Sequence, residues 1–125
     1  VSDDVASFVV PLCATIHLSG SMLKIVSCAL ALILMNGGIY NVSLFTEFIL
    51  ILAITMVAAP GVPGGAIMAA LAVLQSVVGF NEEQLALMVS LYIAMDSFGT
   101  ACNVTGDGAI AVIVNRLQGK KSKES

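Results

Sequence analysis

The sequence predicts an all-α integral membrane protein, and three observations support this prediction. Hydrophobic residues make up 58% of the 125 residues, and the mean hydropathy is +1.02. Charged residues make up only 10%, whereas a typical soluble domain carries about 25%. The apolar residues form long segments separated by turn residues and short polar stretches. A soluble protein of this composition would have too little polar surface to face water, and no basic patch suggests a nucleic-acid partner.

The first apolar segment, residues 7–35, predicts a broken transmembrane helix. As one straight helix, residues 8–35 would extend about 42 Å, which exceeds a bilayer core of about 30 Å. The middle of the segment reads TIHLSGS, and Lys24 follows it. Polar side chains and a Gly at mid-membrane favour an interruption, where freed carbonyls can line a site. On a continuous helix, His17, Ser21 and Lys24 would share one face and a polar network.

Residues 42–80 predict a re-entrant helical hairpin. Two apolar arms, residues 42–58 and 66–80, flank the tip APGVPGG at residues 59–65. Each arm is short for a full span, and the tip has no Lys or Arg, which a cytoplasmic loop usually carries. Two full spans are the alternative interpretation.

The most informative pattern is a polar stripe between apolar segments near the C-terminus. Asp96, Thr100, Asn103 and Asp107 are spaced by four, three and four residues, which places them on one face of a helix. Two carboxylates on one stripe of a membrane helix are costly, so they usually face a cavity, a partner or an ion. The stripe therefore predicts a functional site. A structural pairing of both carboxylates with Lys24 is the alternative.

This stripe belongs to the last transmembrane helix, which is predicted for residues 82–118 with Asn81 as its cap. Gly99, Gly106 and Gly108 are expected to loosen that helix.

Four of the five basic residues lie at the end of the chain, at Arg116, Lys120, Lys121 and Lys123. The positive-inside rule therefore places the C-terminus and the polar tail, residues 119–125, in the cytoplasm. We expect a multi-pass protein of the cell inner (plasma) membrane. The chain begins with Val and shows no signal-peptide pattern, so we expect an excerpt from a longer protein.

Three motifs along the chain resemble one known family. PLCATIHLSGS at 11–21, APGVPGG at 59–65 and NVTGD at 103–107 resemble parts of the dicarboxylate/amino acid:cation symporters, the glutamate-transporter family. These parts are the broken seventh helix, the tip of the second hairpin and the last transmembrane helix. The resemblance implies that residues 1–125 form the C-terminal part of an elevator-type transport domain. It also implies a missing N-terminal part, a lipid bilayer as environment and, usually, a homotrimer.

The resemblance implies a substrate site on the stripe and the hairpin tip. Asp96 would hold the amino group of an amino acid substrate, while Thr100 and Asn103 would hydrogen-bond the substrate. The backbone that would contact the substrate's carboxylate lies at Val62, Pro63 and Gly64.

The resemblance also implies Na⁺ as the transported coupling ion. Asp107 would bind one Na⁺ together with backbone oxygens near Cys13, His17 and Asn103. A second Na⁺ would lie among backbone carbonyls at Thr15, Met56, Val57 and Ala59. Na⁺ is a hard cation that prefers carboxylate and carbonyl oxygens, as Ca²⁺ does, and unwound membrane helices offer such carbonyls.

The chain departs from the family's pattern at two positions. Acidic-substrate members carry an Arg just before the residue that matches Thr100, where this chain has Gly99. Without that guanidinium there is no bidentate clamp for a side-chain carboxylate, which favours a small neutral amino acid as the substrate. Ser19 stands in place of a carboxylate ligand of a third sodium site. The number of coupled Na⁺ ions is therefore expected to be lower, or a proton takes part.

We predict a sodium-coupled symporter that imports a small neutral amino acid, and not an enzyme, since the sequence shows no catalytic triad, phosphate loop or metal-enzyme motif. A dicarboxylate or acidic amino acid symporter with its clamp elsewhere is the first alternative. A channel-like protein and a non-transporting membrane subunit are others, although no filter repeat is visible. His17 is either a satisfied buried histidine or a proton-coupling group. Lys24 is either a structural partner or a fixed cation in place of an ion.

Overall fold

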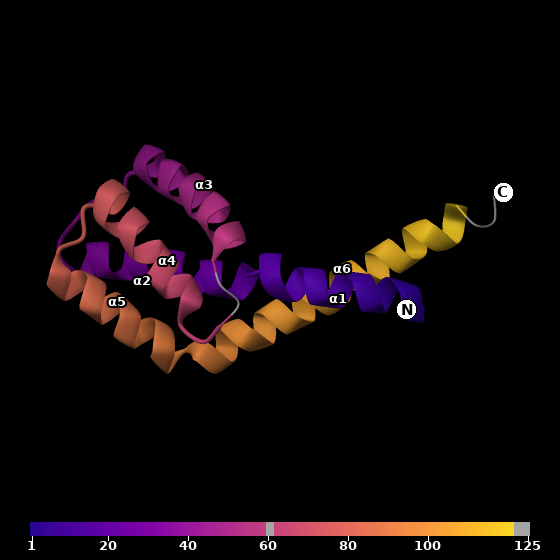
Figure 1. The fold of residues 1–125 in the computed structure, drawn as a ribbon. Coiled ribbons are helices and arrows are strands. Elements are labelled where there is room, and N and C mark those ends of the chain that lie inside the picture. The colour runs from indigo at the N-terminus through magenta and orange to yellow at the C-terminus, as the bar shows by residue number, and fades with distance from the viewer. Residues whose placement is uncertain (60–61, 122–125) are drawn as a thin grey trace.

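A computed structural model describes residues 1–59 and 62–121, the last two of these as backbone only. Within these residues every regular element is helical, which confirms the predicted all-α class. The elements are α1 (Asp3–Ile16), α2 (Ser19–Met35), α3 (Val42–Ala58), α4 (Gly65–Val73), the π-helix η1 (Leu74–Val78), α5 (Glu82–Ala94) and α6 (Asp96–Lys121). In Figure 1, α2 to α5 gather at one end of the molecule, and α1 runs beside α6 at the other.

The first apolar segment is interrupted at His17 and Leu18. The backbone is extended at His17 (φ −105°, ψ 91°) and irregular at Leu18 (φ −113°, ψ 47°). The His17 N–H donates to the Cys13 carbonyl at 2.8 Å and so closes α1. The interruption lies within the polar stretch 15–21. The expectation of one continuous helix face for His17, Ser21 and Lys24 is wrong, because His17 lies between the two helices.

α3 and α4 form two antiparallel arms that pack against each other and against α2 (Figure 1). The large side chains at this contact are fully buried, at Ile25, Phe45, Phe48, Leu52, Ile67 and Leu74. Gly64 directly precedes α4 and caps it with φ 76°, a left-handed conformation that Gly adopts at little cost. Pro60 and Gly61 of the predicted tip lie outside the described residues.

α5 begins with a cap that the sequence predicted. The Asn81 side chain accepts from the Gln84 N–H at 2.9 Å, and the Gln84 side chain accepts from the Asn81 N–H at 2.9 Å. The two bonds form a capping box, which satisfies two backbone donors that the helix itself leaves free.

The helix predicted for residues 82–118 is not continuous. It is interrupted at Met95 (φ −102°, ψ 20°), and Figure 1 shows a bend between α5 and α6 at this point. The expectation that glycines loosen the helix is wrong, because Gly99, Gly106 and Gly108 all lie within the uninterrupted α6. α6 also continues through Lys121, into the tail predicted for 119–125, of which residues 122–125 lie outside the described part.

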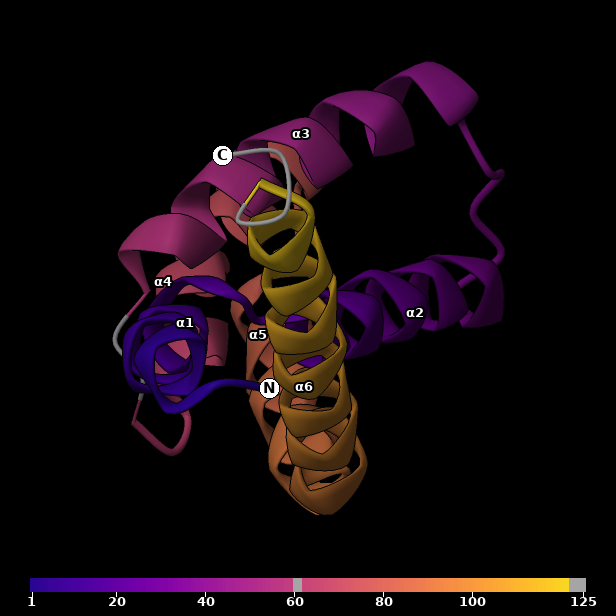
Figure 2. The same ribbon diagram turned by 90° about the vertical axis from the view of Figure 1, so that its right-hand side faces the viewer.

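α6 packs along both α1 and α2, as the end-on view in Figure 2 shows for α1. The contact with α1 buries a small apolar cluster of Val5, Val9, Cys13 and Ala111. At the contact with α2, a Cβ on Gly20 would collide with the carbonyl oxygen of Gly99. Only a residue without a side chain therefore lets α2 and α6 approach this closely.

Two stretches are long and apolar enough to cross a membrane, judged by length and composition. One is Asp3–Met35, which α1 and α2 form together, and the other is Asp96–Gly119. Within their most apolar windows only 39% and 17% of the residues are buried by the rest of the chain. Large apolar side chains such as Phe8, Ile54 and Phe98 are exposed. Exposed apolar surface of this extent is expected where lipid or further protein covers it.

Candidate functional site

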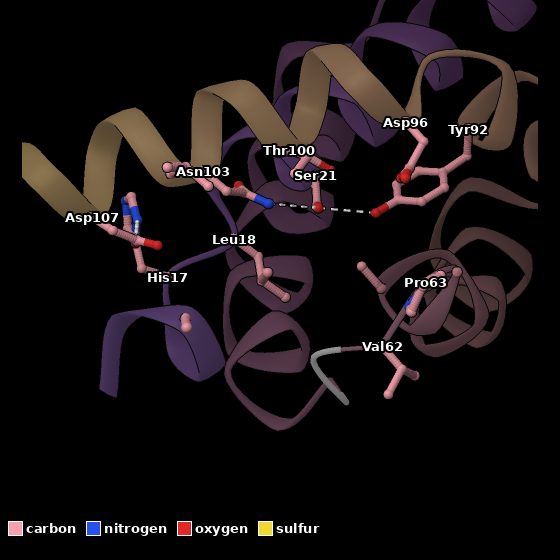
Figure 3. Close-up of a pocket in the computed structure, with 14 residues that line it drawn as sticks. His17, Leu18, Ser21, Val62, Pro63, Tyr92, Asp96, Thr100, Asn103 and Asp107 are labelled. Atoms are coloured by element: carbon pink, nitrogen blue, oxygen red, sulfur yellow. Dashed lines mark hydrogen bonds and ion pairs between the residues drawn. The ribbon is translucent and has the colours of Figure 1, made fainter. Parts of the chain in front are cut away.

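A pocket of about 270 Å³ opens where the interruption after α1, the hairpin tip and α6 meet. Figure 3 shows α6 along one wall, with Val62 and Pro63 of the tip on the opposite side. The pocket is lined by Ala14, His17, Leu18, Ser21, Val62, Pro63, Gly64, Ala66, Tyr92, Asp96, Thr100, Asn103, Val104 and Asp107. Pockets for drug-sized ligands hold about 300–1,000 Å³, so this one suits a small ligand.

The four residues of the predicted stripe all line this pocket. Asp96 starts α6, and Thr100, Asn103 and Asp107 follow on the same face of the helix (Figure 3). The stripe spans the length of the pocket, with a carboxylate at each end and two neutral polar side chains between them. A ligand lying along α6 would therefore meet both charged and uncharged polar groups.

Asp107 is paired with the residue at the helix interruption. His17 Nδ1 lies 2.8 Å from Asp107 Oδ1, with side chains that are 27% and 12% exposed. Gly106 makes room for the imidazole, since a Cβ at this position would collide with His17 Cε1. The pairing of Asp107 with Lys24, which the sequence left open, is not what the structure has.

Asn103 lies in a hydrogen-bond network that joins α6 to α2 and α5. The Gly20 N–H donates to Asn103 Oδ1 at 2.8 Å, and Asn103 Nδ2 donates to Ser21 Oγ at 3.3 Å. The Tyr92 hydroxyl donates to the same Ser21 Oγ at 2.9 Å (Figure 3). Because a hydroxyl oxygen has two lone pairs, Ser21 accepts both bonds and fixes the pocket wall.

Asp96, at the start of α6, faces Lys24 of α2. Lys24 Nζ lies 3.5 Å from Asp96 Oδ1, and the Lys24 side chain is 7% exposed while that of Asp96 is 51% exposed. Asp96 lines the pocket and Lys24 does not. Lys24 thus contacts the Asp96 carboxylate from outside the pocket lining, while Asp96 itself lines the cavity.

The hairpin tip supplies the wall opposite α6. Val62, Pro63 and Gly64 line the pocket, as does Ala66 in the first turn of α4. The first turn of a helix has N–H groups without intrahelical partners and a partial positive charge. This wall is therefore suited to a carboxylate, whereas the opposite wall carries Asp96 and Asp107.

Six predicted site residues lie outside the pocket lining. Gly99 lies against the Lys24 side chain and not against the cavity. Cys13 and Thr15 lie in the last turn of α1, Met56 and Val57 lie in the last turn of α3, and Ala59 follows α3 directly. The two helices α1 and α3 that carry these residues are in contact with each other.

Tyr92 is a pocket residue that the sequence reasoning missed. It precedes Asp96 by four residues, which on the continuous helix predicted from the sequence is the next position of the stripe, although in the structure Tyr92 lies in α5, before the interruption at Met95. An aromatic residue in an apolar segment gives no signal of a polar role by itself. The spacing of four from Asp96 is the signal that could have found it.

Comparisons with known proteins identify the family of the chain. The family model described as "Sodium:dicarboxylate symporter family" matches residues 1–117. The chain belongs to the sodium:dicarboxylate symporter family. Among curated relatives, the "Proton/sodium-glutamate symport protein" of Bacillus caldotenax is 31% identical over 96% of this chain and 28% of its own length. "Excitatory amino acid transporter 2" of Homo sapiens is 30% identical over 90% of this chain and 20% of its own length.

The chain therefore spans about a quarter of the length of these relatives. No solved structure gives a significant match. This membership confirms the resemblance to the dicarboxylate/amino acid:cation symporters that the three sequence motifs showed.

Proposed function

We propose that this chain is the C-terminal part of the transport domain of a sodium-coupled symporter, and that the symporter imports a small neutral amino acid. The observation that carries the proposal is the chemistry of the pocket. It has carboxylates on the α6 wall and the start of α4 on the opposite wall. An α-amino acid presents an ammonium and a carboxylate to match these two walls.

The substrate's ammonium would bind Asp96, and its carboxylate would lie at the hairpin tip, at Val62 to Gly64. Thr100 would hydrogen-bond the ligand between them. Among the described residues that line the pocket, none is Lys or Arg, so a second carboxylate on the ligand would find no fixed cationic partner. A small neutral side chain fits this environment best.

Sodium would bind as a transported ion next to the substrate. Asp107 offers a carboxylate close to the end of α1, and the end of α3 contributes the second proposed group of carbonyls. Both helices end with a partial negative charge. The Cys13 and Met56 carbonyls each accept one bond from a capping N–H, of His17 and Ala59 respectively, and each keeps a second lone pair for an ion. The His17 contact uses one oxygen of Asp107, so bound Na⁺ would share this carboxylate with the imidazole.

Alternating access would follow the elevator pattern, with residues 42–80 as a re-entrant hairpin that covers the pocket from outside. The hairpin tip forms one wall of the pocket, and the two arms are shorter than the candidate spans, which supports this role. We further propose that the complete protein is a homotrimer of the plasma membrane with a cytoplasmic C-terminus.

An acidic amino acid or dicarboxylate is the second candidate substrate. It is favoured by the names of the curated relatives, which include a glutamate symport protein. Against it stands Gly99, which supplies no cation to the pocket.

Uptake into liposomes by the full-length protein tests the proposal. L-Serine or L-alanine is compared with L-aspartate, each with and without an inward Na⁺ gradient. We expect uptake of the neutral amino acid only, and only with the gradient. Uptake of L-aspartate instead would favour the second candidate, and uptake of neither would contradict a symporter of amino acids. Saturable counterflow separates a carrier from a channel.

A further inference from the structure

Lys24 is a buried cation placed at the junction of three groups that favour positive charge. Its Nζ donates to the Tyr92 carbonyl at 3.3 Å and lies 3.6 Å from the centroid of the Tyr92 ring. The same Nζ lies 3.5 Å from Asp96 Oδ1. The Tyr92 carbonyl is in the last turn of α5, where the helix dipole favours a cation, and an aromatic face adds to this attraction.

The absence of a side chain at position 99 provides the space for this ammonium. A Cβ on Gly99 would collide with Lys24 Cε and would lie 2.8 Å from Nζ. The obstructing atoms belong to the end of a flexible side chain, so a residue larger than Gly would displace the Lys24 ammonium without moving a backbone. Gly99 thus acts through Lys24 and not through the pocket, whose lining it does not join.

The two stripe carboxylates consequently differ in the kind of partner they have. Asp107 faces an imidazole, whose charge depends on protonation, whereas Asp96 faces an ammonium that carries a full positive charge. A carboxylate inside a membrane is costly unless a cation compensates it. At Asp96 the chain itself supplies that cation.

We propose that Lys24 is the resident counter-cation of Asp96, held in the space at Gly99, so that the empty pocket needs no mobile cation at this carboxylate. The inference rests on the proposed symporter function and extends it to the ligand-free state. The distance of 3.5 Å is longer than the 2.7–2.9 Å or so of a tight charge-assisted bond. Lys24 therefore compensates Asp96 from behind and leaves it able to bind a substrate's ammonium.

Removing the ammonium converts Asp96 into a site for a small monovalent cation. Lys24→Met keeps much of the side-chain length and removes the charge, so K⁺ takes over the compensation of Asp96. Lys24→Arg keeps the charge and serves as the matched control. In Lys24→Met/Asp96→Asn both charges are absent, so no K⁺ site should form.

The test is thermal unfolding of the purified full-length protein, titrated with KCl against choline chloride at constant ionic strength and without Na⁺. We expect the unfolding midpoint of Lys24→Met to rise by at least about 2 °C with K⁺, because a ligand that binds only the folded state stabilises it. The midpoints of wild type, Lys24→Arg and Lys24→Met/Asp96→Asn should not respond to K⁺.

A Lys24→Met protein that is indifferent to K⁺ would overturn the inference, as would a wild type that responds to K⁺ equally. If Lys24→Met does not fold, Gly99→Ala gives the same test, because its Cβ displaces the Lys24 ammonium while both charges remain. We then expect a K⁺ response in Gly99→Ala that Asp96→Asn abolishes. This readout needs no transport, so a failure of the proposed symport activity is seen separately in the liposome assay.

Discussion

At the level of single residues, both stripe carboxylates are contacted by basic side chains from the interrupted first segment. Lys24 contacts Asp96 and His17 contacts Asp107. Desolvating an ion pair is costly, and removing one partner leaves the other charge uncompensated. Substitutions of these four residues should therefore be interpreted as pairs, with each single variant compared to its double.

Ser21 is the residue whose loss should disturb the uncharged part of the pocket most. Ser21→Ala removes the acceptor of both the Tyr92 hydroxyl and Asn103 Nδ2, leaving two donors near the pocket without a partner. We expect a loss of about 1–3 kcal/mol in the free energy of unfolding. Tyr92→Phe removes only one donor and should cost about 0.5–1.5 kcal/mol.

Denaturation of the purified protein measures both losses, and the double variant measures their coupling. Because the two residues share one hydrogen bond, the double variant should cost less than the two single losses added together. If the double variant lost as much unfolding free energy as the two single variants together, the Tyr92–Ser21 bond would not contribute to stability.

At the level of secondary-structure elements, the α2–α6 contact positions the site. Gly20 touches the α6 backbone, and its own N–H holds the Asn103 side chain. Gly20→Ala should push α2 away from α6, because its Cβ would collide with a carbonyl oxygen and would lie 2.7 Å from Cys102 Cβ. We expect a loss of about 1–3 kcal/mol in unfolding free energy, together with weaker substrate binding.

Gly108→Ala is the matched control for this prediction. Gly108 lies in α6, and nothing lies within 4 Å of a Cβ placed there. The substitution should therefore stabilise the protein by about 0.4–1 kcal/mol. A Gly20→Ala protein that is as stable as Gly108→Ala and binds substrate normally would contradict the close α2–α6 contact.

Local patterns were enough to predict some of these elements, whereas contacts between elements were not. The spacing of Asp96 to Asp107 predicts a shared face because helical periodicity is local. The polar stretch around His17 likewise marks the interruption. The bend at Met95 was missed, since no Pro marks it and the polar residues that follow it were interpreted as part of one continuous helix. At the bend, the Tyr92 carbonyl accepts from Lys24 of another helix. Nothing in the local sequence specifies that partner.

At the level of the whole molecule, the described residues form a pocket lined by polar and apolar side chains but leave much apolar surface uncovered. Phe8, Ile54 and Phe98 are each more than two-thirds exposed, which is consistent with a chain that spans about a quarter of the length of its relatives. The pocket is formed by elements far apart in sequence, which are the interruption after α1, the hairpin tip and the first half of α6, so its geometry depends on the fold as a unit. Tests of function accordingly use the full-length protein.

The most direct measurement is equilibrium binding of L-serine to the purified full-length protein as a function of Na⁺ concentration. If one coupled Na⁺ binds at Asp107, the affinity for L-serine should rise by up to about tenfold per tenfold increase in Na⁺. Asp107→Asn should lose this dependence, and L-aspartate should not compete. Binding of L-serine that is indifferent to Na⁺, or tighter binding of L-aspartate, would contradict a sodium-coupled site for a neutral amino acid.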